Sequence, residues 1–330
     1  MTGNCVGRGV LASLVFVFAA GAGPVRAQGV FESAGERALG MGGAFVAVAD
    51  DATAVHWNPA GLVGGQPAGM TIGWHHFQVG NPDDTAAPGF SRGRSTLTSL
   101  GTWPLGVSYG TFRRTALRDA GSGVLESQSL QVGHIGVTVL QGIVPGVVVG
   151  TTLKVLRGGL ATGLVDQQTV GAALDAGAEL DASRRTTFDL DAAVMARAAR
   201  VAAGLTLKNL RSPSFSAVAG NSVELPRQAR VGVSVLPADG VTLAMDLDLN
   251  TVDLMGDLRR ILAVGGETAL GSRLQVRSGV RWNLAGDRRV VGAVGASVSV
   301  RRGLWIDGHY ALGRNDEARE FGVALRAGFQ

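Results

Sequence analysis

The sequence predicts an all-β protein: a transmembrane antiparallel up-and-down β-barrel of about 14 strands, with a partly helical N-terminal plug in its lumen. Three observations predict this fold. The chain starts with the layout of an export leader, only 17% of its residues are charged, and long segments alternate apolar with polar residues. About a quarter of the residues of a typical soluble domain are charged. A chain this poor in charge fits a surface that faces lipid.

Residues 1–27 have the organisation of a signal peptide. Arg8 precedes the apolar stretch 10–23, and Val25-Arg26-Ala27 forms a small-x-small cleavage site. The apolar stretch is too short to span a bilayer as a helix. The only cysteine, Cys5, lies before this stretch, where it is not placed for lipid anchoring. We therefore expect a mature chain without disulfides, thiol catalysis or cysteine-ligated metals.

The alternation is clearest in segments 240–250, 273–284 and 319–329. Each has apolar residues at every second position, and its length of about 10 to 12 residues matches the roughly 9–11 that cross a bilayer at a tilt. The intervening positions carry charges of both signs in mid-strand, as expected in a hydrated barrel interior. We predict that these lumen-wall charges are Asp246, Asp248, Arg277, Arg281, Glu320 and Arg326.

Weaker alternation brings the number of candidate strands between residues 67 and 330 to about 15. Long and short links alternate between them, as they do in outer-membrane barrels of even strand number. This order slips once, between about 180 and 200, so we infer that one strand there is overcounted and that about 14 remain; about 16 stays arithmetically possible. The weaker candidates are 67–79, 95–103, 104–113, 130–141, 145–157, 168–180, 186–197, 199–210, 227–236, 259–270, 289–300 and 303–312.

A soluble β-sandwich is the alternative, because its strands show the same period with the apolar face turned inward. Periodicity alone does not separate the two folds. The leader, the strand length and the low charge favour the barrel.

Residues 28–66 break the strand pattern and predict a plug. Ser33 and Glu36 have capping-box spacing, and apolar residues from Ala38 to Val48 recur at helical intervals. Asp50 or Asp51 can cap a second short turn. A barrel of about 14 strands leaves a lumen, so we expect this segment inside it. We also expect Asp50 or Asp51 to pair with a lumen arginine such as Arg277 or Arg281.

The stretch "GERALGMGGAFVAVADDATAVHWNPAGL" resembles the N-terminal signature of the FadL-type superfamily of outer-membrane barrels, including its PorV/PorQ-like branch. The small-residue run, the Asp-rich step and the Asn-Pro-Ala turn of that signature match 42–44, 50–51 and 58–61. "LTLKNL" and "LPRQARVGVSV", at 205–210 and 225–235, also look like the PorV-like branch. The resemblance implies a 14-stranded barrel with an N-terminal hatch, in the outer membrane of a Gram-negative cell envelope.

FadL-type members pass long-chain fatty acids or other hydrophobic molecules, whereas PorV-like members serve protein secretion and surface attachment. The resemblance therefore implies passive passage of fatty-acid-like hydrophobic or amphipathic molecules. The alternative is a PorV-like accessory barrel without small-molecule transport. The expected partners are outer-membrane lipid and either such a ligand or exported proteins. The expected plug and gating residues are Asp50, Asp51, His56, Trp57, Asn58, Pro59, Ala60 and Gly61.

Catalysis and cofactor binding are not expected. Asp50, Asp51 and His56 are acid–base or metal-ligand types, but positions 51 and 56 point apart on a helical turn. His75 and His76 are consecutive on a predicted strand, so they face opposite sides. No basic cluster is interleaved with aromatics, which argues against nucleic acid as a partner. We predict a protein that is not an enzyme and has no metal site and no cofactor.

Overall fold

The computed structural model describes residues 31–120, 124–166, 168–217, 222–255, 257–286, 288–313 and 318–329. The predicted signal peptide, 1–27, lies outside the described residues. So do residues 28–30 at the start of the predicted plug.

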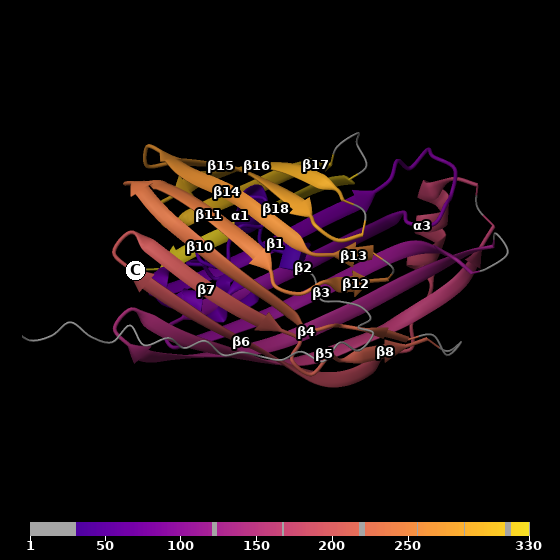
Figure 1. Ribbon diagram of the computed structural model, residues 1–330, viewed down its shortest axis with the longest axis horizontal. Helices are drawn as coiled ribbons and strands as arrows, with labels where there is room; N and C mark the ends of the chain where they lie inside the picture. The colour runs from indigo at the N-terminus through magenta and orange to yellow at the C-terminus, as the bar shows by residue number, and fades with distance from the viewer. Residues whose placement is uncertain are drawn as a thin grey trace, which may run out of the picture.

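Within the described residues, 14 antiparallel strands form one closed barrel, and the last strand pairs with the first. This confirms the predicted fold class and strand number. Each of the remaining barrel strands pairs with the barrel strands that precede and follow it in the sequence, so the topology is up-and-down (Figure 1). The barrel strands are β1 Ala68–Val79, β2 Ser91–Thr102, β3 Leu105–Asp119, β4 Leu125–Val144, β5 Val147–Val165, β6 Arg185–Ala198, β7 Val201–Lys208, β10 Gln228–Ala238, β11 Val241–Asp248, β14 Ile261–Leu270, β15 Leu274–Asn283, β16 Val290–Arg301, β17 Leu304–Gly313 and β18 Ala318–Phe329.

One predicted strand, 168–180, is wrong. It contains the helix α3, Val170–Glu179, whose N-cap is Thr169. The buried residues Val170, Ala173, Leu174 and Gly177 recur at the spacing of a helix and not at that of a strand. This segment is the overcounted strand, and it lies slightly earlier in the chain than the expected slip.

The two ends of the barrel differ. Tight turns join strands at the end near the C-terminus, whereas long connections, α3 and two small sheets occupy the other end (Figure 1). The small sheets pair β8 (Ser214–Ser216) with β9 (Ser222–Glu224) and β12 (Val252–Leu254) with β13 (Asp257–Arg259). None of the helices in the described part of the chain has the length and apolar character needed to span a membrane.

The strands separate apolar and polar side chains between the two faces of the wall. On β11, Leu243 and Met245 are 49% and 47% exposed, whereas Asp246 and Asp248 are buried. Arg277, Arg281 and Glu320 are also buried, and Arg326 is partly buried. The exposed outer face is largely aliphatic and aromatic, which is the arrangement expected where a barrel contacts hydrocarbon.

Residues 31–66 pack inside the barrel in short helical turns. These are η1 (Phe31–Ser33), α1 (Glu36–Gly40), α2 (Ala54–Trp57) and η2 (Pro59–Gly64). The expected helical run from Ala38 to Val48 ends at Gly40, because Gly42 and Gly43 adopt left-handed backbone with φ of 69° and 89°. Gly35, and not Ser33, precedes α1. α1 contacts β15 to β18, and η2 contacts β2 and β4 to β6, so the segment spans the lumen.

Candidate functional site

Arg37 is the centre of a buried ion-pair cluster between the N-terminal segment and the wall. Its guanidinium donates to Glu267 on β14 through Nη2 at 2.7 Å and Nε at 2.9 Å. It also pairs with Asp50 and, at 3.1 Å, with Asp51. The Arg37 side chain is only 10% exposed. This cluster fastens α1 to the turn at Asp50 and Asp51 and both of them to β14.

The predicted pairing of Asp50 or Asp51 with Arg277 or Arg281 is wrong. Both aspartates pair with Arg37, which the sequence reasoning did not single out. The left-handed turn after α1 folds the segment back on itself and supplies a cation from within it. The wall arginines have wall partners: Arg277 lies 3.1 Å from Glu267 and 3.9 Å from Asp307, and Arg281 pairs with Glu320.

The charges in this cluster stabilise one another. Burial alone would lower the pKa of Arg37, but the three carboxylates outweigh it and hold the pKa above its usual value. Burial alone would raise the pKa of Asp51, yet Arg37 and the hydrogen bonds from Thr53 hold it below its usual value. Arg37 and Asp51 are therefore both ionised at neutral pH.

Asn58 forms a second attachment, made of neutral hydrogen bonds. Its Oδ1 accepts from the Ala60 amide at 3.1 Å, and its Nδ2 donates to the carbonyl oxygens of Val46 at 2.8 Å and Val194 at 3.3 Å. Val194 belongs to β6, and Asn58 is fully buried. One side chain thus closes the turn, ties it to the rest of the segment and reaches the wall.

Other predicted gating residues surround this attachment. The Trp57 indole donates to the Ala34 carbonyl at 3.0 Å, and Thr206 of β7 donates to the Trp57 carbonyl at 3.0 Å. A Cβ at Gly150 of β5 would lie 2.5 Å from the Ala60 amide nitrogen and 2.8 Å from the Pro59 side chain. A Cβ at Gly61 would lie 2.0 Å from the Ala49 carbonyl oxygen. Small residues therefore allow the backbones to approach closely here.

Asp246 is the predicted wall charge that binds the segment through its backbone. One carboxylate oxygen accepts from the amides of Phe45 at 2.9 Å and Val46 at 2.8 Å. The remaining predicted wall charges pair mainly along the wall. Asp248 accepts from Arg230 at 2.6 Å, and Arg326 donates to Asp307 at 2.9 Å.

His56 lines a small chamber of about 100 Å³ between the segment and the wall. Lys208 Nζ lies 3.2 Å from His56 Nδ1, and His134 and Lys154 line the same chamber. Lys154 is neutralised by Asp189 at 2.8 Å and by Asp191. Among the described residues, no group of three or more histidine, cysteine or acidic side chains is arranged to hold a metal ion.

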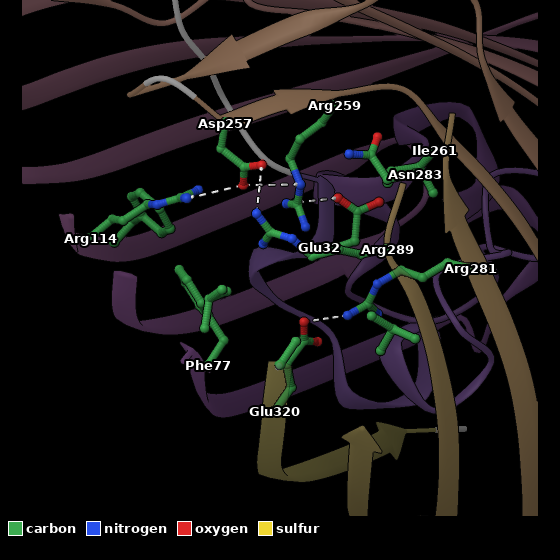
Figure 2. Close-up of a pocket in the computed structure, with 14 residues that line it drawn as sticks. Glu32, Phe77, Arg114, Asp257, Arg259, Ile261, Arg281, Asn283, Arg289 and Glu320 are labelled. Atoms are coloured by element: carbon green, nitrogen blue, oxygen red, sulfur yellow. Dashed lines mark hydrogen bonds and ion pairs between the residues drawn. The ribbon is translucent and has the colours of Figure 1, made fainter. Parts of the chain in front are cut away.

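A second chamber lies toward the end with the long loops (Figure 2). Three arginines surround Asp257 of β13: Arg114 at 3.1 Å, Arg289 at 3.6 Å and Arg259 at 3.8 Å. Burial alone would raise the pKa of Asp257, but Arg259, Arg114 and Arg289 hold it below its usual value. Sequence reasoning missed this group because Asp257 lies in a long loop that only the fold brings over the lumen.

Glu32 links this chamber to the N-terminal segment. It lies 2.6 Å from Arg230 and 4.0 Å from Arg259. Burial alone would raise the pKa of Glu32, but Arg230 and Arg259 lower it to about 2. Phe77 and Val291 supply apolar surface to the same chamber. This chamber is therefore lined by ion pairs together with a few apolar side chains.

Several solved structures resemble most of the chain. The Ralstonia pickettii toluene transporter TbuX is 14% identical, with 91% of this chain and 99% of that chain covered and a TM-score of 0.61. The CymD monoaromatic hydrocarbon channel is 16% identical, with 90% and 97% covered and a TM-score of 0.62. A Pseudomonas aeruginosa FadL homologue is 11% identical, with 93% and 99% covered and a TM-score of 0.59.

Residues 119–248 match the protein-family model described as "F plasmid transfer operon, TraF, protein". No curated protein matches the chain significantly. The structural likeness extends over almost the full length at low sequence identity, so it establishes a FadL-type barrel fold.

Proposed function

We propose that the chain is an outer-membrane barrel for passage of hydrophobic or amphipathic small molecules, and that residues 28–66 are the plug that gates it. The observation that carries the proposal is that residues 31–66 occupy the lumen. Polar contacts centred on Arg37 and Asn58 hold these residues to the wall. Buried apolar side chains of the segment, such as Phe45 and Leu62, also pack against the wall. The ion pairs and hydrogen bonds are the contacts that can be exchanged for contacts with water.

The outer face supports the membrane location. Aliphatic and aromatic side chains cover it, whereas the charges lie inside. TbuX is described as a toluene transporter and CymD as a monoaromatic hydrocarbon channel, and both share the fold. These likenesses favour transport over the secretion-accessory alternative. The barrel itself is assigned to residues 67–330, and the leader 1–27 is assigned to export.

The proposed mechanism is passive. A ligand enters from the long-loop end and reaches the chamber above the plug, where apolar patches lie beside ion pairs. Separation of Arg37 from Glu267 frees α1 from β14, while the Asn58 turn keeps the plug attached to β6. A route then opens between α1 and the wall.

A disulfide between plug and wall tests the gate. A Cβ at Gly69 of β1 would lie 4.0 Å from the Ala52 Cβ, within the range that a disulfide spans. The variant Ala52→Cys/Gly69→Cys is reconstituted in vesicles, and entry of a labelled fatty acid and of toluene is measured. We expect the oxidised form to lose entry and the reduced form to regain it.

The two single-cysteine variants under the same oxidant are the controls. The chain has no cysteine other than Cys5, so no other pairing competes after leader removal. Equal ligand entry in the oxidised and reduced forms would show that this plug does not move during passage. Absence of entry in both forms, and in the unmodified protein, would reject the transport function itself.

A further inference from the structure

The outer surface of the barrel has a hollow of about 760 Å³ on β1 to β6, toward the long-loop end. Arginines gather around it: Arg94 of β2, Arg113 of β3, Arg157 of β5 and Arg184 just before β6. Arg94, Arg157 and Arg184 are exposed, and Arg113 is partly buried. In the part of the chain that the structure describes, no aspartate or glutamate lines the hollow.

The strand register brings these arginines together. Arg94 is the direct cross-strand partner of Arg113, and Arg157 is the partner of Gly133 on one side and of Thr186 on the other. Side chains of direct partners on one face lie about 5 Å apart at Cβ, and like charges so placed are destabilising. The small residues Thr96, Thr111 and Gly133 form the floor between them.

The positive charge is not neutralised within the described residues. None of the four arginines forms an ion pair there. Arg113 donates to the Ala178 carbonyl of α3 at 2.9 Å, and Gln131 donates to the Leu180 carbonyl at 3.3 Å. Asp181 attracts Arg113 electrostatically, whereas Arg94 and Arg184 repel it. The end of α3 therefore binds two residues that line the hollow, through carbonyl oxygens, and the hollow keeps a net excess of positive charge.

The apolar part of the outer face begins next to the hollow, on the side of the short turns. One same-face position from Arg157 and two from Arg113, toward the short turns, the outer face presents Tyr109, Ile135, Val155 and Phe188, which are 54%, 55%, 39% and 52% exposed. Trp74 borders the hollow and packs against Phe321 at 5.3 Å. Aromatic residues mark the boundary between hydrocarbon and head groups in such barrels. The arginines thus stand at head-group depth.

We propose that this hollow binds the phosphate group of a lipid in the outer leaflet, with the acyl chains of that lipid lying on the apolar surface below. Guanidinium groups bind phosphate oxygens through paired hydrogen bonds, and arginine is well suited to such sites. The long-loop end of outer-membrane barrels faces outward. The site depends on the membrane location proposed above, but not on what passes through the lumen or on movement of the plug.

A charge-removal variant with a matched control tests the site. Arg94→Gln/Arg157→Gln/Arg184→Gln removes the three exposed arginines and keeps Arg113, which bonds the α3 carbonyl. Arg200→Gln/Arg273→Gln/Arg301→Gln removes three exposed arginines at the short-turn end. Each full-length protein is purified from phosphatidylcholine nanodiscs doped with bisphosphorylated lipid A, and bound lipid is quantified by native mass spectrometry.

We expect the unmodified protein and the short-turn variant to retain the phosphorylated lipid and the hollow variant to bind it about 100-fold more weakly, since each basic residue near a membrane surface contributes appreciably to anionic lipid binding. Circular dichroism confirms that each barrel is folded. If the triple variant does not fold, Arg157→Gln alone, at an exposed position, is compared with Arg273→Gln and is expected to weaken binding about fivefold.

Three outcomes would overturn the proposal. One is equal lipid retention by the hollow variant and its control. Another is equal retention of the same lipid after its phosphates are removed. The third is displacement of the lipid by an equal concentration of inorganic phosphate, which would show a simple anion site. A protein that is monodisperse in buffer without detergent would reject the membrane location, an outcome distinct from these three.

Discussion

The proposed plug is held to the wall by two attachments of opposite chemistry. At the Arg37 attachment, one guanidinium joins three carboxylates from the plug and β14. At the Asn58 attachment, one neutral amide binds three backbone groups, and Thr206 adds a fourth contact through the Trp57 carbonyl. We expect the Arg37 attachment to respond to changes in charge and ionic strength. The Asn58 attachment depends instead on hydrogen-bond geometry and close packing.

If the proposed gating takes place, this difference predicts where the motion starts. Charged groups released from the Arg37 attachment are well solvated by water, which offsets much of the lost pairing energy. The amide of Asn58 gains less from water, and close packing at Gly150 and Gly61 holds the backbone around it. We therefore expect the Arg37 side to open while the Asn58 side acts as the hinge. Cysteines placed at Ala38 and Ala47 report on the two sides, because both positions are buried.

The largest effect is expected from Arg37→Met. This change leaves Asp51, at 7% exposure, without its cation and leaves Glu267, at 9% exposure, with Arg277 alone. Breaking a buried pair in this way costs about 4 kcal/mol. We expect maleimide labelling of Ala38→Cys to accelerate by about two to three orders of magnitude, with little change at Ala47→Cys.

Arg200→Met is the control, because Arg200 and its partner Asp239 are exposed at 58% and 96% and such surface pairs contribute at most about 1 kcal/mol. Unchanged labelling at position 38 in Arg37→Met would show that the ion pairs do not hold the plug.

A smaller but broader effect is expected from Asn58→Ala. Loss of one buried amide that satisfies three backbone groups costs about 3 kcal/mol. We expect faster labelling at both position 38 and position 47, and a lower thermal unfolding midpoint measured by circular dichroism. Asn81→Ala, in an exposed loop, is the control. Labelling at position 38 alone would contradict the hinge, because the two attachments would then be equivalent.

The barrel wall could be predicted from the sequence because exposed apolar side chains on one face and buried polar side chains on the other leave a period of two along each strand. Segment 168–180 could not, because small residues such as Ala173 and Gly177 blur the distinction between strand and helix. The Arg37 cluster also escaped prediction. It forms only because Gly42 and Gly43 turn the plug back on itself, a tertiary effect that no local pattern encodes. Arg37 is nevertheless the only arginine of residues 28–66, a signal that could have identified it.

Glu36, beside Arg37 on α1, adds a dependence on pH. It is 2% exposed and points at the wall where Gly73 and Gly322 make room: a Cβ there would lie 2.6 Å and 3.0 Å from its carboxylate oxygens. Its Oε2 has no hydrogen-bond partner among the described residues. Burial, and then repulsion from Asp307 and Asp51, raise the pKa of Glu36 to about 8.

The smallest effect at neutral pH is therefore expected from Glu36→Gln, which replaces a carboxyl that is already protonated in the seated plug. A released Glu36 regains the ordinary pKa of 4.5, so between that value and about 8 the seated form holds a proton that the released form lacks. Binding of the plug to the wall must then weaken as pH rises through this window, by at most about 1.4 kcal/mol per pH unit.

We expect labelling at position 38, normalised to the unfolded protein at each pH, to rise toward pH 8 in the unmodified protein and to stay flat in Glu36→Gln. Glu179→Gln, on an exposed position of α3, should behave as the unmodified protein does. A pH profile that survives Glu36→Gln would assign the dependence to another group and leave the Arg37 attachment governed by its ion pairs alone.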